Sequence, residues 1–343
     1  AKFAEKLVST LPKGLDTVYF TNSGSEANDL AILMARAYTK NYDVIALRNG
    51  YHGGSQGAMG LTSHSTWKFG VPHGFGVHHS VVPDRYRGHF GYDDPEAGEK
   101  YALDVLDVIQ RGSSGAIAAF IAEPMQGVGG VIELPPNYLR DAYSYVREAG
   151  GICIADEVQT GFGRTGENFW GFEQHGVVPD MVVMAKGIGN GCPLAAVVTT
   201  KEIAKSLTQA IHFNTFGGNP VSCAQGLATL NVLLNDDMQG NSKMLGEKLF
   251  SGLHTLQEKY ACIGDVRGKG LMVGVELVED DDKTPATQLT ADIFETCKNM
   301  GLIIGKGGYF GNVLRIKPPM CITQEDIDFM LEVLDDAFAK ETV

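Results

Sequence analysis

The fold is decided by the stretch Ile152-Cys153-Ile154-Ala155-Asp156-Glu157-Val158-Gln159-Thr160-Gly161. Its first half has no polar side chain other than a thiol until Asp156, which is the pattern of a strand buried on both faces of a sheet. A second apolar run, residues 181–185, follows and ends on Lys186. Each segment therefore delivers one ionisable side chain at its C-terminal end, which is where open α/β sheets collect their ligands.

A carboxylate and an amine at neighbouring strand ends are what an enzyme needs to hold pyridoxal phosphate (PLP). The carboxylate keeps the pyridine nitrogen protonated, and the lysine forms a Schiff base with the aldehyde. A lysine partly withdrawn from water also has a lowered pKa, so it can act as a nucleophile and then as a base. We therefore predict that Asp156 and Lys186 face one shared PLP molecule.

Short apolar runs punctuate the first two hundred residues and predict a mostly parallel, seven-stranded sheet covered by helices. Several are continuous Val, Ile, Leu and Ala runs rather than alternating ones. Helical patterns separate many of them, including an apolar stripe at spacings of three and four that begins at Ala27. The predicted strands are residues 18–21, 44–47, 76–82, 117–122, 151–155, 181–185 and 194–199.

The C-terminal part of the sequence has a different character. Residues 266–278 are rich in β-formers and interrupted by glycine, residues 289–300 predict a helix, and residues 301–316 return to strand. Thr323-Gln-Glu-Asp326 resembles a capping box that opens a final helix. We predict a large PLP-binding α/β domain over residues 1–238 and a small α+β domain over residues 239–343.

Composition excludes several classes of function. The net charge of −13 argues against a nucleic-acid or anionic-membrane surface as the main partner. The apolar runs are far shorter than a bilayer span. The six cysteines lack CxxC or zinc-like spacing, and the histidines form no HxxxH pattern, so we predict free thiols and no metal site.

A Gly-Ser turn within residues 22–28 lies between the first predicted strand and the first helix. Such a turn offers backbone N–H groups, a hydroxyl and the positive end of the helix dipole to a phosphate. An ordinary Ser or Asn helix cap is the structural alternative. Tyr51 follows the second strand, where its ring would stack on a flat cofactor or on neighbouring side chains.

Three further residues complete the candidate site. Glu123 follows the fourth strand, and a buried charge there is costly unless it is paired or used. Thr215 offers a hydroxyl in a tight turn before a predicted helix. Arg315 stands on a β-like segment, where its guanidinium would grip a carboxylate through two hydrogen bonds or form a surface ion pair.

These motifs, in this order, resemble those of the class III (subgroup II) PLP-dependent aminotransferases. The resemblance runs from Ser23-Gly-Ser-Glu-Ala through Asp156-Glu-Val-Gln-Thr-Gly and Ala185-Lys186-Gly to Leu314-Arg-Ile, and so covers nearly the whole chain. It implies the aspartate-aminotransferase-like fold (PLP fold type I). It also implies a homodimer with shared active sites, with a tetramer as an alternative.

The resemblance also implies how the cofactor is held. Gly24 and Ser25 would bind its phosphate, and Thr215 would do so from the partner subunit. Tyr51 would stack on one face of the ring while Val158 packs on the other.

The remaining roles concern polar groups. Asp156 would pair with the pyridine nitrogen, Gln159 would lie near the ring hydroxyl, and Glu123 would order the hydrogen bonds around the cofactor. Lys186 would form the Schiff base and then shuttle the proton during ping-pong amino transfer. Arg315 would bind the substrate α-carboxylate.

One departure from the family narrows the substrate. Ornithine, acetylornithine and 4-aminobutyrate enzymes of the family carry Glu five residues after the position of Glu123, where it can neutralise the carboxylate-binding arginine. Here that position is Val128. The resemblance then points to a small α-amino donor and is strongest to the mitochondrial (type 2) alanine–glyoxylate aminotransferases, so we expect alanine as donor and glyoxylate as acceptor.

The beginning of the chain departs from the family as well. It starts Ala-Lys-Phe-Ala without an initiator Met or a signal-peptide pattern. We expect a processed or truncated chain that lacks the family's N-terminal segment and any targeting segment. The resemblance suggests the mitochondrial matrix.

The sequence leaves alternative functions open. Within the family they are an ω-amino acid (3-aminoisobutyrate or β-alanine)–pyruvate aminotransferase, and an aminomutase or decarboxylase on the same scaffold. Outside it, Gly53-Gly-Ser55-Gln-Gly57 matches the GxSxG nucleophile elbow of α/β-hydrolases, although that Ser should directly follow a strand. A non-catalytic protein of the same fold would fit better if Lys186 were replaced.

Overall fold

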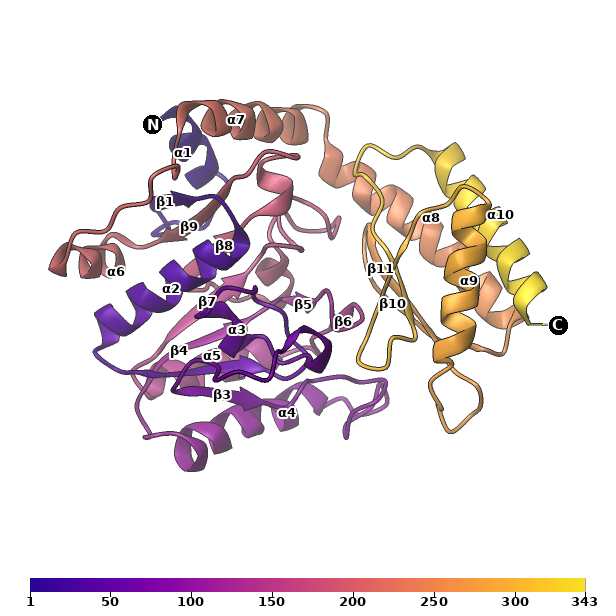
Figure 1. Ribbon diagram of the computed structural model, residues 1–343, viewed down its shortest axis with the longest axis horizontal. Helices are drawn as coiled ribbons and strands as arrows, with labels where there is room; N and C mark the ends of the chain where they lie inside the picture. The colour runs from indigo at the N-terminus through magenta and orange to yellow at the C-terminus, as the bar shows by residue number, and fades with distance from the viewer. Residues whose placement is uncertain (343) are drawn as a thin grey trace. The chain divides into compact units, whose positions relative to one another are not determined.

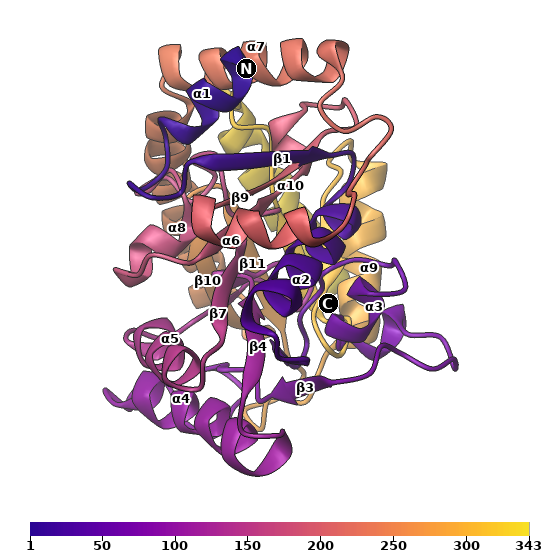
Figure 2. The same cartoon turned by 90° about the vertical axis from the view of Figure 1, so that its left-hand side faces the viewer.

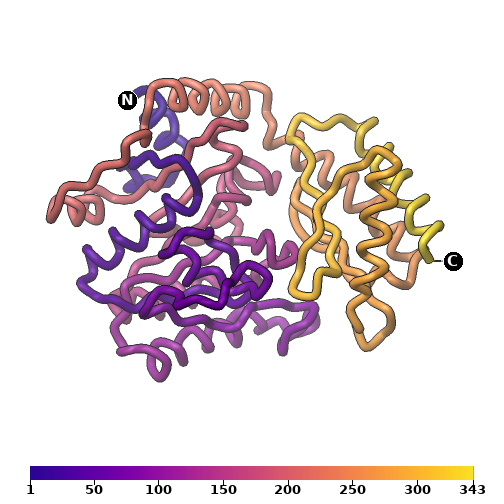
Figure 3. Tube along the Cα trace, viewed as in Figure 1, coloured from indigo at the N-terminus to yellow at the C-terminus, as the bar shows by residue number. Residues whose placement is uncertain are grey.

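The computed structural model describes residues 1–342 and divides the chain into two compact units. Unit 1 comprises Ala1–Pro124, Leu134–Phe162 and Trp170–Asn235. Unit 2 comprises Met125–Glu133, Gly163–Phe169 and the C-terminal segment from Asp236. That segment, orange to yellow in Figure 3, folds on itself.

Unit 1 is built on a seven-stranded sheet of order β1-β9-β8-β7-β4-β2-β3 (Figure 1). The pairs β3–β2, β2–β4, β4–β7 and β7–β8 are parallel, while β9 runs antiparallel to both β8 and β1. The predicted mostly parallel sheet is confirmed. Its strands are β1 (Thr17–Thr21), β2 (Asp43–Leu47), β3 (Val77–Ser80), β4 (Ile117–Ala122), β7 (Ile152–Asp156), β8 (Met181–Met184) and β9 (Ala195–Thr199).

Helices cover both faces of this sheet (Figure 2). Because successive side chains of a strand point to opposite faces, neighbours such as Ile121 and Phe120 pack into different cores. The Ile121 face packs against α2 (Gly24–Thr39), and the Phe120 face packs against α4 (Ala97–Asp107) and α5 (Tyr138–Glu148). This double burial explains why the strands read as continuous apolar runs.

The remaining helices complete unit 1. Helix α1 (Lys2–Val8) packs beside α7 (Pro220–Asn235), as Figure 1 shows. The others are α3 (Ala58–Leu61), α6 (Lys201–Ala204), η1 (Ser65–Trp67), the π-helical turn η2 (Val108–Gly112), η3 (Gly171–His175), η4 (Lys186–Ile188) and η5 (Lys205–Gln209).

Unit 2 contains a four-stranded antiparallel sheet of order β10-β11-β13-β12. Strands β10 (Ile263–Lys269) and β11 (Met272–Leu277) form a hairpin. Strand β13 (Val313–Ile316) pairs with the other edge of β11, and β12 (Gly305–Gly307) pairs with β13. Helices α8 (Met238–Lys259), α9 (Thr287–Asn299) and α10 (Gln324–Glu341) pack with this sheet around one apolar core.

Two short segments of the predicted large domain belong to the second compact unit. Met125–Glu133 contains the small β5 (Met125–Gln126) and β6 (Ile132–Glu133) pair, and Gly163–Phe169 follows the Asp156 motif. The sequence gives no sign of this, because both segments pack with residues of unit 2 although their neighbours in the chain belong to unit 1. The last boundary between the two units along the chain lies after Asn235, close to the expected domain boundary at residue 238.

Within residues 1–342, no helix is both long enough and apolar enough to span a bilayer. All six cysteines are free thiols.

Candidate active site

A cavity of about 650 Å³ opens in unit 1, where several parallel strands end. Glu123 follows β4, Asp156 is the last residue of β7, and Lys186 begins the turn after β8. All three line the cavity, because parallel neighbours end at the same edge of a sheet. The predicted residues Gly24, Ser25, Tyr51, Val158 and Gln159 line it too.

The Asp156 carboxylate is buried and fully engaged by hydrogen bonds. Its Oδ2 lies 2.7 Å from Nδ1 of His52 and accepts a hydrogen bond of 3.0 Å from Nδ2 of Asn28, while Oδ1 accepts one of 3.1 Å from the backbone N–H of Val158. Asn28 Nδ2 also donates to the carbonyl of His52. The carboxylate is therefore held rigidly at the cavity wall.

His52 and Asp156 form a buried pair in which each side chain stabilises the charged form of the other. Burial alone would raise the pKa of Asp156, but the His52 contact and charge, with Asn28 and Val158, hold that pKa below its ordinary value. Burial alone would lower the pKa of His52, but the hydrogen bond and charge of Asp156, with the charge of Glu123, raise it. Asp156 thus presents negative charge to the cavity.

The first turn of α2 forms another part of the wall. Ser23 is the helix cap, because its hydroxyl accepts from the N–H of Glu26, so the capping alternative holds for this serine. Gly24 and Ser25 follow it and line the cavity with the positive end of the helix. A Cβ added at Gly53 would lie 2.4 Å from the Ser25 hydroxyl, so the next loop approaches this turn closely.

Lys186 is exposed in this chain, so the expected partial desolvation is wrong for it. The strand ends at Met184, and the turn that follows carries Lys186 to the lip of the cavity rather than into the core. Its φ of 50° places it in the left-handed region, which is uncommon for residues other than glycine and occurs often at functional sites.

Glu123 and Tyr51 are linked on the same side of the cavity. The buried Glu123 carboxylate accepts a hydrogen bond of 3.1 Å from the backbone N–H of Tyr51. The Tyr51 ring meets Trp67 edge-on, with centroids 5.1 Å apart. The loop after β2 is therefore fixed where its aromatic ring lines the cavity.

Glu157, next to Asp156, does not line the cavity and instead forms hydrogen bonds with the segment that follows it. Its carboxylate accepts hydrogen bonds from the Thr160 hydroxyl (2.6 Å) and from the backbone N–H groups of Gly171 (2.9 Å) and Phe172 (2.8 Å). Burial raises the pKa of Glu157 to about 7, although these bonds favour the charged form.

Two predicted residues lie elsewhere in the chain. Thr215 is exposed in the segment between η5 and α7 and is not part of the cavity wall. Arg315 belongs to β13 of unit 2, where it lies among the residues lining a second cavity of about 610 Å³. Sequence reasoning overlooked His52 and Asn28 as partners of Asp156, and also Cys192, which lines the first cavity.

The hydrolase alternative has no support in the geometry. Ser55 lies well beyond the end of β2 at Leu47, and its hydroxyl accepts a hydrogen bond from the N–H of Ala58. It does not line the cavity that holds Lys186 and Asp156. Among residues 1–342, no cluster of three or more His, Cys, Asp and Glu side chains is placed to bind a metal.

The cavity suits PLP. A buried carboxylate kept ionised matches a protonated ring nitrogen, and a lysine at the lip matches the aldehyde. The tyrosine and valine offer apolar surfaces to a flat ring, and the first turn of α2 offers the N–H groups that phosphate needs. The residues present therefore fit the cofactor.

Comparison with known proteins agrees with this geometry. The chain is 57% identical over 341 residues to "Alanine–glyoxylate aminotransferase 2 homolog 2, mitochondrial" of Arabidopsis thaliana, covering 99% of this chain and 70% of that protein. It is 45% identical over 362 residues to "Alanine–glyoxylate aminotransferase 2, mitochondrial" of Homo sapiens, with the same coverage.

A solved structure shares the fold. An amine transaminase from an uncultivated Pseudomonas species, in its PLP-bound form, superposes with a TM-score of 0.91 at 32% identity, over 99% of this chain and 80% of that one. Residues 1–338 match the sequence profile described as aminotransferase class III. The chain therefore belongs to the class III aminotransferase family and is a PLP-dependent transaminase.

Proposed function

We propose that this transaminase moves the amino group of alanine to glyoxylate. The observation that carries the proposal is the residue at position 128, which is Val where a carboxylate would neutralise Arg315. The backbone of Val128 lies beside Arg315 within unit 2, because a Cβ added at Gly307 would meet both the Val128 carbonyl oxygen (2.9 Å) and Cδ of Arg315 (2.5 Å). Position 128 therefore supplies no carboxylate that would compete for the guanidinium with a substrate carboxylate next to the reacting amine.

The names of the relatives support the same pair of substrates. The Arabidopsis and human proteins are both alanine–glyoxylate aminotransferases in name. We further propose the mitochondrial matrix as the location, since both names include that organelle.

In this proposal, residues of the first cavity hold the cofactor. Gly24 and Ser25 bind its phosphate, Tyr51 and Val158 pack on the two faces of its ring, and Asp156 pairs with the ring nitrogen. Bound PLP stores the amino group between the two half-reactions and withdraws electrons from the reacting carbon.

The remaining residues orient the cofactor and the substrate or transfer a proton. Lys186 carries the proton to and from the substrate carbon, and its place at the lip of the cavity supports this role. Gln159 lies near the ring hydroxyl, and Glu123 orders the hydrogen bonds around the cofactor through the loop of Tyr51. Arg315 binds the α-carboxylate.

A homodimer is also part of the proposal. Thr215 would bind the cofactor phosphate of the partner subunit, and its exposure in a segment with large exposed apolar side chains supports this.

A panel of amino donors tests the proposal directly. Purified, PLP-loaded protein is supplied with L-alanine, β-alanine or 3-aminoisobutyrate, each with glyoxylate or pyruvate as acceptor, and the products are quantified. We expect the highest kcat/KM for alanine with glyoxylate. A preference for β-alanine or 3-aminoisobutyrate with pyruvate would instead identify the ω-amino acid–pyruvate enzyme.

A further inference from the structure

Arg315 is flanked by glycines in the four-stranded sheet of unit 2. Arg315 lies on β13, opposite Gly274 of β11 and Gly305 of β12. A side chain in an antiparallel sheet contacts the residue directly opposite and the two diagonal ones. Arg315 therefore has no side chain opposite it on either neighbouring strand.

The diagonal neighbour on β12 is Gly307, and it is in close contact with Arg315. A Cβ added at Gly307 would lie 2.5 Å from Cδ and 3.4 Å from Nη1 of Arg315. It would also lie 2.9 Å from the carbonyl oxygen of Val128. The arginine side chain therefore crosses directly over a glycine, in space that any side chain at position 307 would fill.

The Val128 side of this space is fixed by backbone contacts. The carbonyl of Val128 accepts a hydrogen bond of 3.1 Å from the N–H of Gly308. Nearby, the carbonyl of Gly130 accepts two hydrogen bonds from Arg267, of 3.0 Å from Nε and 2.8 Å from Nη2. These bonds hold the segment 128–130 against the sheet.

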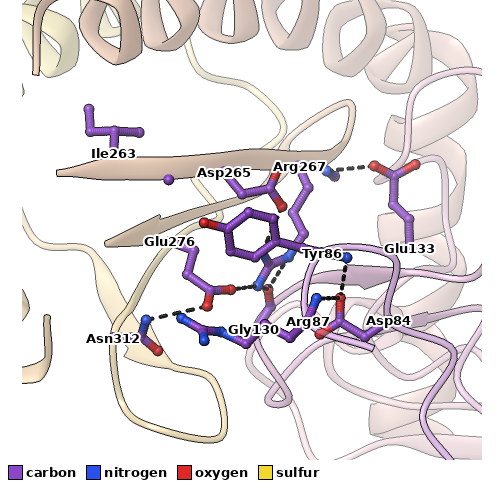
Figure 4. Close-up of polar contacts among 12 residues, drawn as sticks. Asp84, Tyr86, Arg87, Gly130, Glu133, Ile263, Asp265, Arg267, Glu276 and Asn312 are labelled. Atoms are coloured by element: carbon purple, nitrogen blue, oxygen red, sulfur yellow. Dashed lines mark hydrogen bonds and ion pairs between the residues drawn. The ribbon is translucent and has the colours of Figure 1, made fainter. Parts of the chain in front are cut away.

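Arg267 can hold this segment because it is itself fully paired. It is 4% exposed and forms ion pairs with Glu276 at 2.6 Å and Asp265 at 2.8 Å, as Figure 4 shows. Gly268 also donates a hydrogen bond of 2.8 Å to Glu133 at the end of the same segment. Next to Gly130, the buried Val131 adopts a φ of 56°, which is strained for a β-branched residue and persists only in a firmly held backbone.

We propose that Gly307 is a positioning residue that determines specificity for amino donors with a carboxylate beside the amine. Because the Val128 carbonyl is fixed, a side chain at position 307 displaces the flexible part of Arg315 and redirects its guanidinium. This inference rests on the proposed role of Arg315 in binding the substrate α-carboxylate. Gly307 acts only through that arginine and touches no reacting atom.

The test compares Gly307→Ala, Arg315→Ala and the double variant. KM and kcat for L-alanine with saturating glyoxylate are measured, together with the dissociation constant of propionate, which has the carboxylate of alanine but no amine. We expect Gly307→Ala to raise the KM for alanine and the propionate constant together by roughly 10-fold, the effect of losing one charge-assisted pair, with kcat within about twofold of the parent. In the Arg315→Ala background, Gly307→Ala should change neither constant further.

A matched control lies on the same strand. A Cβ at Gly305 would approach only the carbonyl (3.2 Å) and Cβ (3.5 Å) of Arg315, not its distal side chain. Gly305→Ala should therefore leave the propionate constant near that of the parent, although it perturbs the same edge strand.

The outcomes separate this inference from the proposed function. If Arg315→Ala leaves both constants unchanged, the assigned role of Arg315 is wrong, and the inference that depends on it is wrong too. If Arg315→Ala raises them but Gly307→Ala does not, or raises them equally in both backgrounds, only the inference on Gly307 is overturned. If Gly307→Ala alone fails to fold, folding of the double variant supports a clash with the arginine, whereas failure of both identifies the Val128 carbonyl as the obstacle and overturns the proposal.

Discussion

At the scale of single residues, the cavity combines a rigid acid with an accessible amine. Asp156 is fixed through both carboxylate oxygens, whereas Lys186 stands on a turn at the lip. The two positions suit different tasks, because a counter-charge must be preorganised and a proton carrier must reach between atoms.

Replacing Lys186 by alanine tests the proton carrier. We expect kcat for alanine and glyoxylate to fall by about 10²–10⁴-fold or more, the range attributed to a positioned acid–base group. The cofactor's visible absorption should also change, because it loses its covalent link. Lys201→Ala, which removes an exposed lysine paired with Asp16, is the control and should retain full activity; transamination by the Lys186 variant at the parent's rate would refute the assignment.

Replacing Asp156 by asparagine tests the buried charge. The variant keeps a similar shape but loses the negative charge that we propose pairs with the ring nitrogen. We expect it to retain PLP while kcat falls by about 10²-fold or more. Cofactor content by absorbance and steady-state kinetics distinguish the two effects, and an unchanged kcat would remove Asp156 from the mechanism.

His52 allows a prediction about pH. Its contact and charge hold the pKa of Asp156 below the ordinary value, so removing it lets that pKa rise. For His52→Gln we expect the acidic limb of the kcat/KM profile to move to higher pH. The profile is measured from acid to neutral pH beside that of the parent. A limb that stays in place would show that His52 does not control the charge of Asp156.

At the scale of elements, Glu157 connects the end of β7 to η3 through hydrogen bonds to the backbone of Gly171 and Phe172. Its carboxyl pKa is raised by burial from 4.5 to about 7 in the folded chain. A raised pKa favours the protonated, folded form, so this stability is complete below about pH 4.5 and is lost as pH rises through about 7. The full effect corresponds to about 3 kcal/mol.

We therefore expect Glu157→Gln to flatten part of the pH dependence of unfolding. Between about pH 5 and pH 8, the parent should lose more free energy of unfolding than the variant, as measured by urea denaturation. Glu173→Gln, in the same 3₁₀ helix, serves as the control and should follow the parent. Parallel curves for the parent and Glu157→Gln would contradict the raised pKa.

The start of α10 provides a second prediction for an element. Thr323 accepts from the N–H of Asp326, whose carboxylate accepts from the N–H of Thr323, so the predicted capping box is confirmed. Thr323→Ala should lower the free energy of unfolding by about 1 kcal/mol. Thr255→Ala, on the exposed side of α8, should cost less in the same urea experiment, and equal losses would argue against the cap.

At the scale of the whole molecule, one segment with exposed apolar side chains supports the proposed homodimer. Between η5 and α7, Ile211 is 99% exposed, Phe213 78% and Phe216 69%. Large apolar side chains concentrated in this way usually mark an interface. Thr215 lies in the same segment, so we expect assembly and completion of the phosphate site to depend on each other.

Ile211→Asp tests this dependence. We expect the variant to dissociate at concentrations where the parent is a dimer, and to lose PLP more readily. Sedimentation velocity gives the mass, and absorbance gives the bound cofactor. Ile303→Asp replaces another highly exposed isoleucine, in unit 2, and should leave the mass unchanged. A parent that sediments as a monomer, or a variant that stays dimeric, would contradict the predicted interface.

The sequence alone determined the sheet and most of the cavity wall. Buried parallel strands must be apolar on both faces, so they stand out as runs, and ionisable residues at their ends are conspicuous for the same reason. Asp156, Glu123 and Lys186 could be predicted to share one edge because parallel strands end on the same side. The capping box was equally local, since it involves one turn of helix.

Only the tertiary structure decided which distant groups meet. The partnership of His52 and Asn28 with Asp156, and the approach of Val128 to Gly307 and Arg315, join residues far apart in the chain. No periodicity records such contacts, because they depend on how loops and strands pack rather than on local backbone preference. A glycine that makes room for an arginine leaves no signal in the sequence, since its role is the absence of a side chain.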